Sequence, residues 1–108
     1  MKYLNITHIK DAYWMLTPEK QAEIRLAELS FHDKCVKSGK LLETYYLPDM
    51  KGSVTIWDLA SSEECARIAI ESPANPYGDN EFTPLIERDV ALKVMKEMAV
   101  KAKKVAKK

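Results

Sequence analysis

The pattern of hydrophobic and polar positions predicts four short β-strands, and in the first and third of them the side chains can be assigned to two alternating faces. The four stretches are residues 2–9, 40–47, 53–59 and 79–87. In the first of them, Leu4, Ile6 and His8 would share one face of a sheet, and that face is largely aliphatic. A five-residue turn with a proline and a glycine joins the second and third stretches, which indicates an antiparallel hairpin. Pro84 cannot donate to a strand ladder, so the last strand is expected at a sheet edge, a bulge or a subunit junction.

Helical signals follow the first strand. Thr17 is a suitable N-cap, Pro18 suits the first helical position, and Gly39 is a typical stop signal. Apolar residues spaced three or four apart predict the buried stripe of this helix. They are Ile24, Ala27, Phe31 and Cys35. Residues 11–16 are expected to form a connection, and its three large side chains would be unusual in a loop unless they cover something.

Two further helices are predicted. Residues 61–64 form a capping box that opens the first of them. This helix must end near Glu71, because Ser72 precedes a proline and is disfavoured in helical geometry. Another helix is expected from Asp89 onward, where the sequence becomes rich in lysine.

The resulting order, β-α-β-β-α-β, predicts an α+β domain of the ferredoxin-like type, with an antiparallel sheet and helices on one face. Residues 1–88 would form this domain and residues 89–108 a basic C-terminal helix. Thr55 and Trp57 are expected on the face without helices, where they would be too apolar for open water. Because a large exposed apolar patch usually marks an interface, we expect two such sheets to pair and the chain to form a homo-oligomer.

Composition narrows the possible partners. The chain has 108 residues, enough for one domain, and its net charge of +1 gives no reason to expect nucleic acid. Cys35 and Cys65 lack metal-ligand spacing and are expected to be reduced thiols, and no metal or cofactor is expected. No apolar stretch approaches the roughly 20 residues of a membrane span, and no signal-peptide core follows the first residues. We therefore expect a cytoplasmic protein without a membrane partner, whose lysine-rich helix is solvated.

Five motifs between residues 32 and 86 carry a resemblance to a known family. They are residues 39–41, 45–48, 52–58, 72–77 and 81–85. Through them the chain resembles the muconolactone isomerase-like family, whose members are dimeric α+β barrels. The resemblance implies a dimer or a larger ring, and a pocket between the sheet and its neighbours. It also implies a cofactor-independent isomerase of aromatic catabolism that moves a double bond in a small unsaturated lactone.

Such a reaction needs groups that remove a proton beside a carbonyl and return it elsewhere. His8, near the end of the first strand, and His32, on the first long helix, are candidate proton carriers, and Glu81 is a candidate carboxylate. A structural histidine with a backbone partner is the alternative for His8, and a helix-surface histidine is the alternative for His32. Asp58 is expected to face solvent or to support the second helix.

Five further residues are candidates for binding a small organic acid or lactone. They are Tyr45, Trp57, Ser72, Asn75 and Tyr77. The tyrosines could donate to an oxyanion or could simply pack, and the loop with Ser72 and Asn75 could bind a ligand or only shape a turn. Since no complete acid–base pair can be recognised, a non-catalytic binding module and a cofactor-free monooxygenase of similar fold stay as alternatives.

Overall fold

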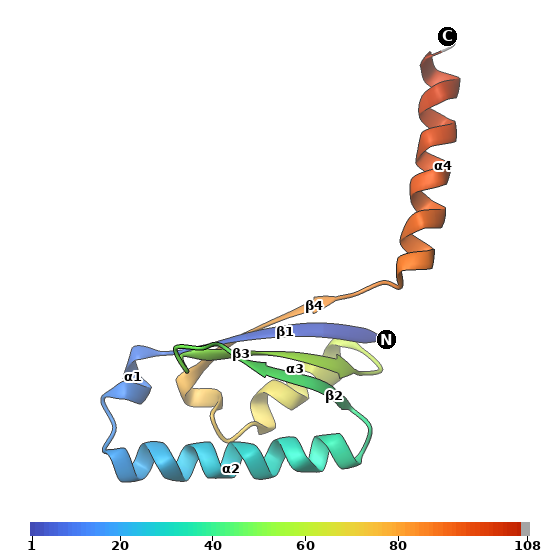
Figure 1. Cartoon of the computed structure of the whole chain (residues 1–108). Helices are drawn as coiled ribbons and strands as arrows, with labels where there is room; N and C mark the ends of the chain where they lie inside the picture. Colours follow the sequence, from blue (N-terminus) through green and yellow to red (C-terminus); the bar gives the residue numbers. More distant parts are fainter. Residues whose placement is uncertain (107–108) are drawn as a thin grey trace.

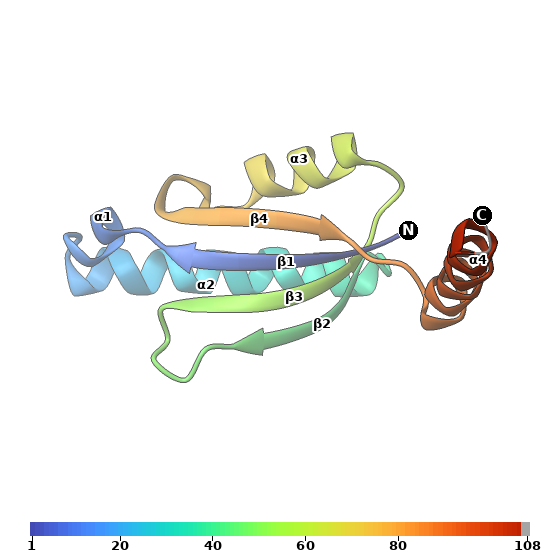
Figure 2. The ribbon, with the colours of Figure 1, turned by 90° about the horizontal axis from the view of Figure 1, so that it is seen from above.

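The structure, a computed structural model, describes residues 1–106 and consists of a four-stranded antiparallel sheet with helices. In chain order the elements are β1 (Lys2–Ile9), α1 (Asp11–Trp14), α2 (Pro18–Lys37), β2 (Leu41–Tyr46), β3 (Gly52–Asp58), α3 (Ser62–Glu71), the 3₁₀ turn η1 (Asn75–Tyr77), β4 (Gly78–Pro84) and α4 (Arg88–Ala106). The strand order is β2-β3-β1-β4, and each neighbouring pair is antiparallel. Helices α2 and α3 cover one face of the sheet (Figure 1; Figure 2 shows the same sheet from above). The α+β class is thus confirmed, and the arrangement is consistent with a ferredoxin-like fold.

The helix ends follow the predicted local signals. The hydroxyl oxygen of Thr17 accepts a hydrogen bond from the backbone N–H of Lys20 at 3.2 Å, and Pro18 is the first residue of α2. Ser61 caps α3 in the same way by accepting from the N–H of Glu64 at 3.2 Å. Gly39 has a φ of +77°, a left-handed conformation that favours glycine after a helix.

The prediction that Thr55 and Trp57 lie on the face without helices is wrong. Both are buried beneath α2 and α3, each with 2% of its surface exposed. The register places Trp57 opposite Tyr3 and Thr55 opposite Asn5, and all four side chains face the helices. Alternation tells which residues of a strand share a face, but it does not tell which face the helices will cover.

The core lies between the sheet and the two helices. Its buried members are Tyr3, Cys35, Leu41, Trp57, Leu59, Cys65 and Ile68, with Phe31 and Phe82 packed against them. Burial raises the pKa of both the Cys35 and Cys65 thiols, which disfavours the reactive thiolate form.

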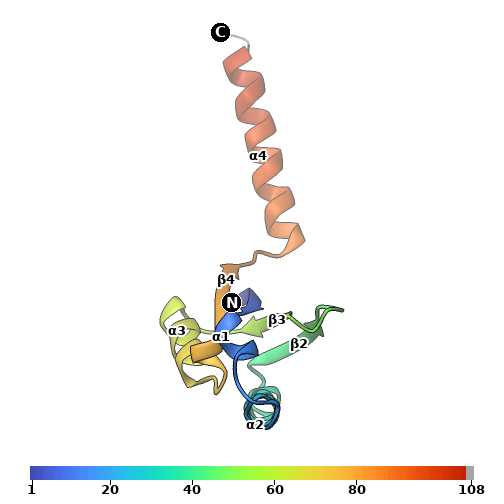
Figure 3. The ribbon, with the colours of Figure 1, turned by 90° about the vertical axis from the view of Figure 1, so that its left-hand side faces the viewer.

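The opposite face of the sheet is not covered by any element of residues 1–106 (Figures 1 and 3). Its centre consists of the partly buried aliphatic side chains of Leu4, Ile6, Val54 and Ile56, which the strand register brings side by side. We call this surface the open face. An apolar uncovered face therefore exists as expected, although it is built from other residues than those predicted.

Two further parts of the chain, residues 11–16 and strand β4, can be compared with what the sequence predicts for them. Residues 11–16, expected to be a connection, contain the short helix α1, and its Tyr13 is 3% exposed and reaches the core. Of the three large side chains in this segment only Tyr13 covers the interior, because Trp14 is 42% and Met15 86% exposed. Strand β4, which ends at Pro84, is an edge strand, so the predicted edge position of that proline is confirmed.

Helix α4 projects away from the domain on the side of the open face (Figures 1 and 3). No element of the described chain packs extensively against it. Several of its apolar side chains are exposed: Val90, Val94, Met95, Met98, Val100 and Val105. No helix within residues 1–106 is both long enough and apolar enough to cross a membrane. The last two lysines of the predicted basic helix, residues 107 and 108, lie outside the described residues.

Candidate functional site

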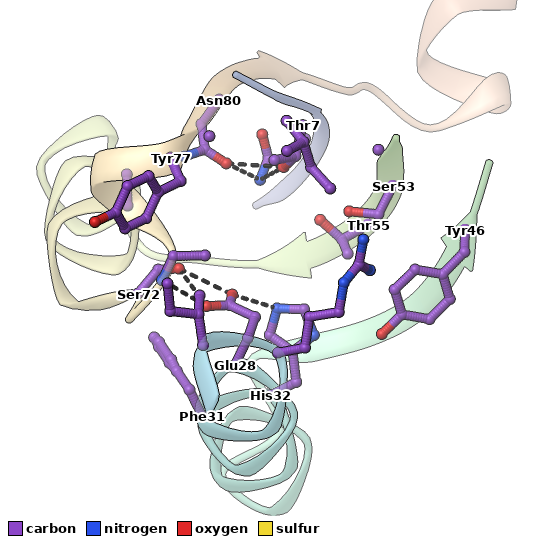
Figure 4. Close-up of a pocket in the computed structure, with 18 of the residues that line it drawn as sticks. Thr7, Glu28, Phe31, His32, Tyr46, Ser53, Thr55, Ser72, Tyr77 and Asn80 are labelled. Atoms are coloured by element: carbon purple, nitrogen blue, oxygen red, sulfur yellow. Dashed lines mark hydrogen bonds and ion pairs between the residues drawn. The ribbon is translucent and has the colours of Figure 1, made fainter. Parts of the chain in front are cut away.

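A cavity of about 340 Å³ lies between the sheet and helix α2 (Figure 4). Side chains from all four strands, from α1, α2 and α3, and from the loop around η1 line it, and most of these side chains are apolar. Its volume is at the lower end of the range of about 300–1,000 Å³ that is typical of small-molecule sites. The cavity therefore suits a compact ligand.

Glu28 and His32 form a hydrogen-bonded pair on the α2 wall of the cavity. They are four residues apart, so the helix places them on the same side, and His32 Nε2 lies 3.0 Å from Glu28 Oε1. Both side chains are largely buried, with 16% of His32 and 23% of Glu28 exposed. The His32 ring also packs edge-on against Trp57, with ring centroids 6.3 Å apart. Within residues 1–106 the second ring nitrogen, Nδ1, makes no hydrogen bond, so one nitrogen is fixed and the other is available.

Glu28 also ties α2 to the loop that follows α3. The hydroxyl of Ser72 donates to its two carboxylate oxygens at 2.7 and 2.9 Å, and the backbone N–H of Ala74 donates to Oε2 at 3.1 Å (Figure 4). Burial by itself raises the pKa of a carboxyl group. Here the hydrogen bonds from His32, Ser72 and Ala74, together with the charge of His32, outweigh burial and lower the pKa of Glu28. Glu28 is therefore ionised at neutral pH and is better suited to orient His32 than to act as a base.

A second polar group lies on the sheet side of the cavity. Asn5 Nδ2 donates to Thr7 Oγ1 at 3.3 Å and to Asn80 Oδ1 at 3.1 Å, and the Thr7 hydroxyl donates to Asn80 Oδ1 at 2.8 Å. Asn5 is 5% exposed, and its carbonyl oxygen, Oδ1, has no hydrogen-bond partner in the described chain. A buried acceptor without a partner is costly, by about 1–3 kcal/mol. It marks a place where a bound molecule could donate.

Arg25 supplies a cation at the cavity wall. Its Nε donates to the Tyr13 hydroxyl at 2.8 Å and its Nη2 donates to the Met50 carbonyl at 3.1 Å. The guanidinium also lies over the rings of Tyr13 and Trp14, at 5.3 and 5.8 Å from their centroids. Tyr13 in turn donates its own hydroxyl proton to the Gln21 carbonyl at 3.0 Å. No carboxylate pairs with Arg25 anywhere in residues 1–106.

Four of the residues predicted from the sequence line this cavity: His32, Trp57, Ser72 and Tyr77. His32 is therefore not a helix-surface histidine. Ser72 reaches the site, but its hydroxyl proton is used by Glu28. Trp57 forms part of the wall and donates its indole N–H to Thr55 Oγ1 at 2.7 Å. Tyr77 packs its ring near that of Tyr13, with centroids 6.3 Å apart.

The structure does not bring the other four predicted residues to the cavity. His8, Tyr45 and Glu81 lie on strand positions that face the open side of the sheet, and all three are exposed. Tyr45 donates its hydroxyl to Glu43 at 2.7 Å, and this bond raises the pKa of Tyr45. Asn75 begins η1 and is not part of the cavity lining. His8 and His32 thus lie on opposite faces of the sheet and cannot act together within one chain.

Sequence reasoning missed Arg25, Glu28 and Asn5. For Glu28 a signal existed, since it falls on the apolar stripe of α2, between Ile24 and Phe31. A charged residue on a buried stripe is rarely left without a partner, and the partner is often functional. No local signal distinguishes Arg25 or Asn5.

Among residues 1–106 no group of three or more His, Cys, Asp or Glu side chains is arranged to hold a metal ion. No protein-family model matches the chain, and no curated protein is similar to it. Among solved structures, the chain is similar to protein Atu4242 from Agrobacterium tumefaciens, with 17% sequence identity and a TM-score of 0.35. The match covers 82% of this chain and 96% of that protein. A likeness this weak does not establish a common fold or a common activity.

Proposed function

We propose that this chain binds a small unsaturated lactone or a related organic acid in the cavity and moves its double bond by proton transfer through His32. The observation that carries the proposal is the His32 ring at the wall of a largely apolar cavity, held through Nε2 by an ionised Glu28 while Nδ1 stays free. A positioned imidazole of this kind is the usual carrier in general acid–base catalysis and contributes about 10²–10⁴-fold in rate. The reaction needs no cofactor.

In the proposed reaction, Nδ1 of neutral His32 takes a proton from a carbon next to the unsaturated system. The electron pair of that C–H bond moves into the conjugated carbonyl, and negative charge develops on the carbonyl oxygen. The imidazolium then returns the proton to a different carbon, so one C–H bond breaks, another forms, and nothing is oxidised or reduced. Glu28 stabilises the imidazolium while it exists, as a carboxylate does in other carboxylate–histidine pairs.

Tyr46, a half-exposed residue of β2, is one donor available for the developing negative charge. It lines the cavity, and its hydroxyl points toward the side where His32 lies (Figure 4). This hydroxyl makes no hydrogen bond to any other residue from 1 to 106, so its proton is available. Donors aimed at the oxygen where charge develops are often the largest single contribution to such catalysis.

The two histidines of the chain allow a matched test. The turnover of a panel of muconolactones, followed by ultraviolet absorbance or NMR, should fall about 100-fold or more in the variant His32→Gln. The variant His8→Gln removes the other histidine, which lies on the open face, and should leave turnover within about twofold. Equal losses in both variants, or no turnover by the unmodified chain, would contradict the proposed activity.

A non-catalytic binding module is the second candidate, and one observation favours it. Besides the bond from His32, Glu28 accepts hydrogen bonds from two residues of the loop after α3, Ser72 and Ala74. These bonds join α2 to that loop and would be useful without any chemistry. In that case the cavity would bind a lactone or an acid tightly without converting it. Calorimetric binding together with no turnover would establish this candidate, and saturable turnover would exclude it.

We further propose that two copies pair through their open faces and form an α+β barrel. The aliphatic strip of Leu4, Ile6, Val54 and Ile56 would then be covered by the same strip of a second copy, at the spacing of about 10 Å typical of stacked sheets. Helix α4 has 19 residues and is therefore about 28 Å long, enough to run past the partner sheet to the helices behind it.

Charge supports a second copy as the occupant of this surface. Residues 1–87 contain nine basic and fourteen acidic residues, whereas α4 contains six basic and two acidic residues. A basic arm thus projects from an acidic body, which favours contact between α4 and the body of a partner. Light scattering should show a dimer, and Met98→Glu should weaken it. Met15→Glu makes the same change at an 86% exposed methionine outside both α4 and the open face, and it should have little effect. A monomer, or a dimer weakened equally by both changes, would refute the arrangement.

A further inference from the structure

Arg25 has donors to spare on the cavity side of α2. A guanidinium carries five N–H groups, and the contacts to Tyr13 and Met50 use only two of them. The aromatic faces of Tyr13 and Trp14 hold the group in place, so little side-chain freedom would be lost when it binds a ligand. A partly buried arginine without a carboxylate partner in the described chain can bind an anion, and a planar carboxylate fits the fork of its donors.

The unpartnered Asn5 Oδ1 gives the cavity a second fixed point, on the sheet. The orientation of this amide follows from its neighbours, because Nδ2 donates to both Thr7 and Asn80. Exchanging oxygen and nitrogen in Asn5 alone would place two carbonyl oxygens, those of Asn5 and Asn80, against each other. With Asn80 Oδ1 accepting from both Asn5 and Thr7, Asn5 Oδ1 is an acceptor that requires a donor such as a hydroxyl group.

We propose that the ligand of this cavity is a small carboxylic acid that also carries a hydroxyl group, with the carboxylate bound by Arg25 and the hydroxyl donating to Asn5 Oδ1. The inference rests on the proposed function, because both use the same cavity. It states which of the small lactones and organic acids the cavity binds most tightly. The apolar wall between Arg25 and Asn5 can pack against a compact, largely unsaturated carbon skeleton. Neutral lactones and amides of the same size bind less tightly, because they leave the guanidinium without its anion.

Matched pairs of small probes test the contacts to Arg25 and Asn5 by isothermal titration calorimetry on the full chain. Benzoate and benzamide have nearly the same shape and differ in charge, so benzoate should bind about tenfold to a hundredfold more tightly, the value of a charge-assisted hydrogen bond. Of 3-hydroxybenzoate and 4-hydroxybenzoate, at least one should bind more tightly than benzoate, because its hydroxyl reaches Asn5. No variant is needed for these two comparisons, so they do not depend on the folding of a mutant.

Substitution of Arg25 then tests whether this residue binds the carboxylate of the probe. Arg25→Gln should weaken benzoate binding about tenfold or more and leave benzamide binding unchanged, and Arg25→Lys should restore part of the affinity. Arg67→Gln is the control, because Arg67 lies on the outer side of α3 with 69% of its side chain exposed and pairs with Glu63. A circular dichroism melt of each variant shows that it is folded.

Several results would overturn the inference: no binding of any acid, equal binding of benzoate and benzamide, or equal loss in the Arg25 and Arg67 variants. Hydroxybenzoates that both bind no better than benzoate would remove the contact to Asn5. The outcome is separable from that of the proposed function. Acids that bind through Arg25 without any lactone turnover would leave this inference standing and exclude the isomerase. Lactone turnover that depends on His32 but is unchanged in Arg25→Gln would do the opposite.

Discussion

Replacement of Glu28 by glutamine probes the group on which the site depends. Glutamine keeps the size of the side chain but removes its charge, and one of its two terminal atoms becomes a donor. In the unmodified chain the Glu28 carboxylate accepts hydrogen bonds from Ser72, Ala74 and His32 at distances of 2.7 to 3.1 Å. A glutamine cannot accept from all three, so at least one buried donor loses its partner.

The expected cost follows from that loss. A hydrogen bond to a charged group contributes about 1.5–3 kcal/mol, so Glu28→Gln should lower the free energy of unfolding at pH 7 by about that amount. For a domain of this size, the melting temperature should fall by roughly 4–8 °C for each kcal/mol. Glu23→Gln is the control on the same helix. Glu23 is 70% exposed and lies 3.5 Å from Lys20, and an exposed pair of this kind contributes about 0–1 kcal/mol.

The pH dependence gives the sharper result. Because the pKa of Glu28 is lowered from its ordinary 4.5 in the folded chain, its ionised form stabilises the fold above 4.5. This stabilisation is lost as the pH falls through the lowered pKa of the folded state. In urea unfolding, the gap between the unmodified chain and Glu28→Gln should therefore be full at pH 7 and should shrink on acidification below 4.5. A gap of the same size at both ends, or no gap at pH 7, would refute the reasoning.

Two further substitutions test the packing that forms the cavity. Trp57→Ala should destabilise the domain by about 3–5 kcal/mol, because Trp57 is 2% exposed and packs in the core. Urea unfolding measures this loss, and a loss below about 1 kcal/mol would contradict the burial of Trp57. Gly52→Ala should cost about 1–3 kcal/mol in the same assay, since a Cβ at Gly52 would collide with the carbonyl oxygen of Thr7 on β1, which is backbone and cannot move aside easily. At Gly39, whose φ is positive, an added Cβ meets no atom within 4 Å. The stability lost in Gly39→Ala therefore measures backbone strain alone, without a collision.

The elements of this fold were predictable because their signals are local. Thr17 and Ser61 cap their helices as the sequence indicates, and the short turn before Gly52 produces the hairpin. What local signals could not supply was the covered face of the sheet. Trp57 was assigned to the wrong side because the choice depends on where α2 and α3 pack, and that is decided by contacts far apart in the sequence.

The candidate site was predictable only in part for the same reason. His32 and Ser72 were selected as single residues, but their connection runs through Glu28, which is 44 residues from Ser72 in the chain. His8 and Glu81 were grouped with them although the strand pleat turns both to the open face. Arg25 looks like any surface arginine until Tyr13 and Met50 are seen to hold it at the cavity.

The central claim is that the cavity around His32, and not the open face around His8, is the functional site. Two-dimensional NMR of the two histidine rings during a titration with muconolactone tests this claim most directly, with His32→Gln and His8→Gln used to assign the signals. The His32 signals should shift in a saturable way while those of His8 stay in place. Shifts of His8 alone, or no shift of either ring up to saturating ligand, would contradict it.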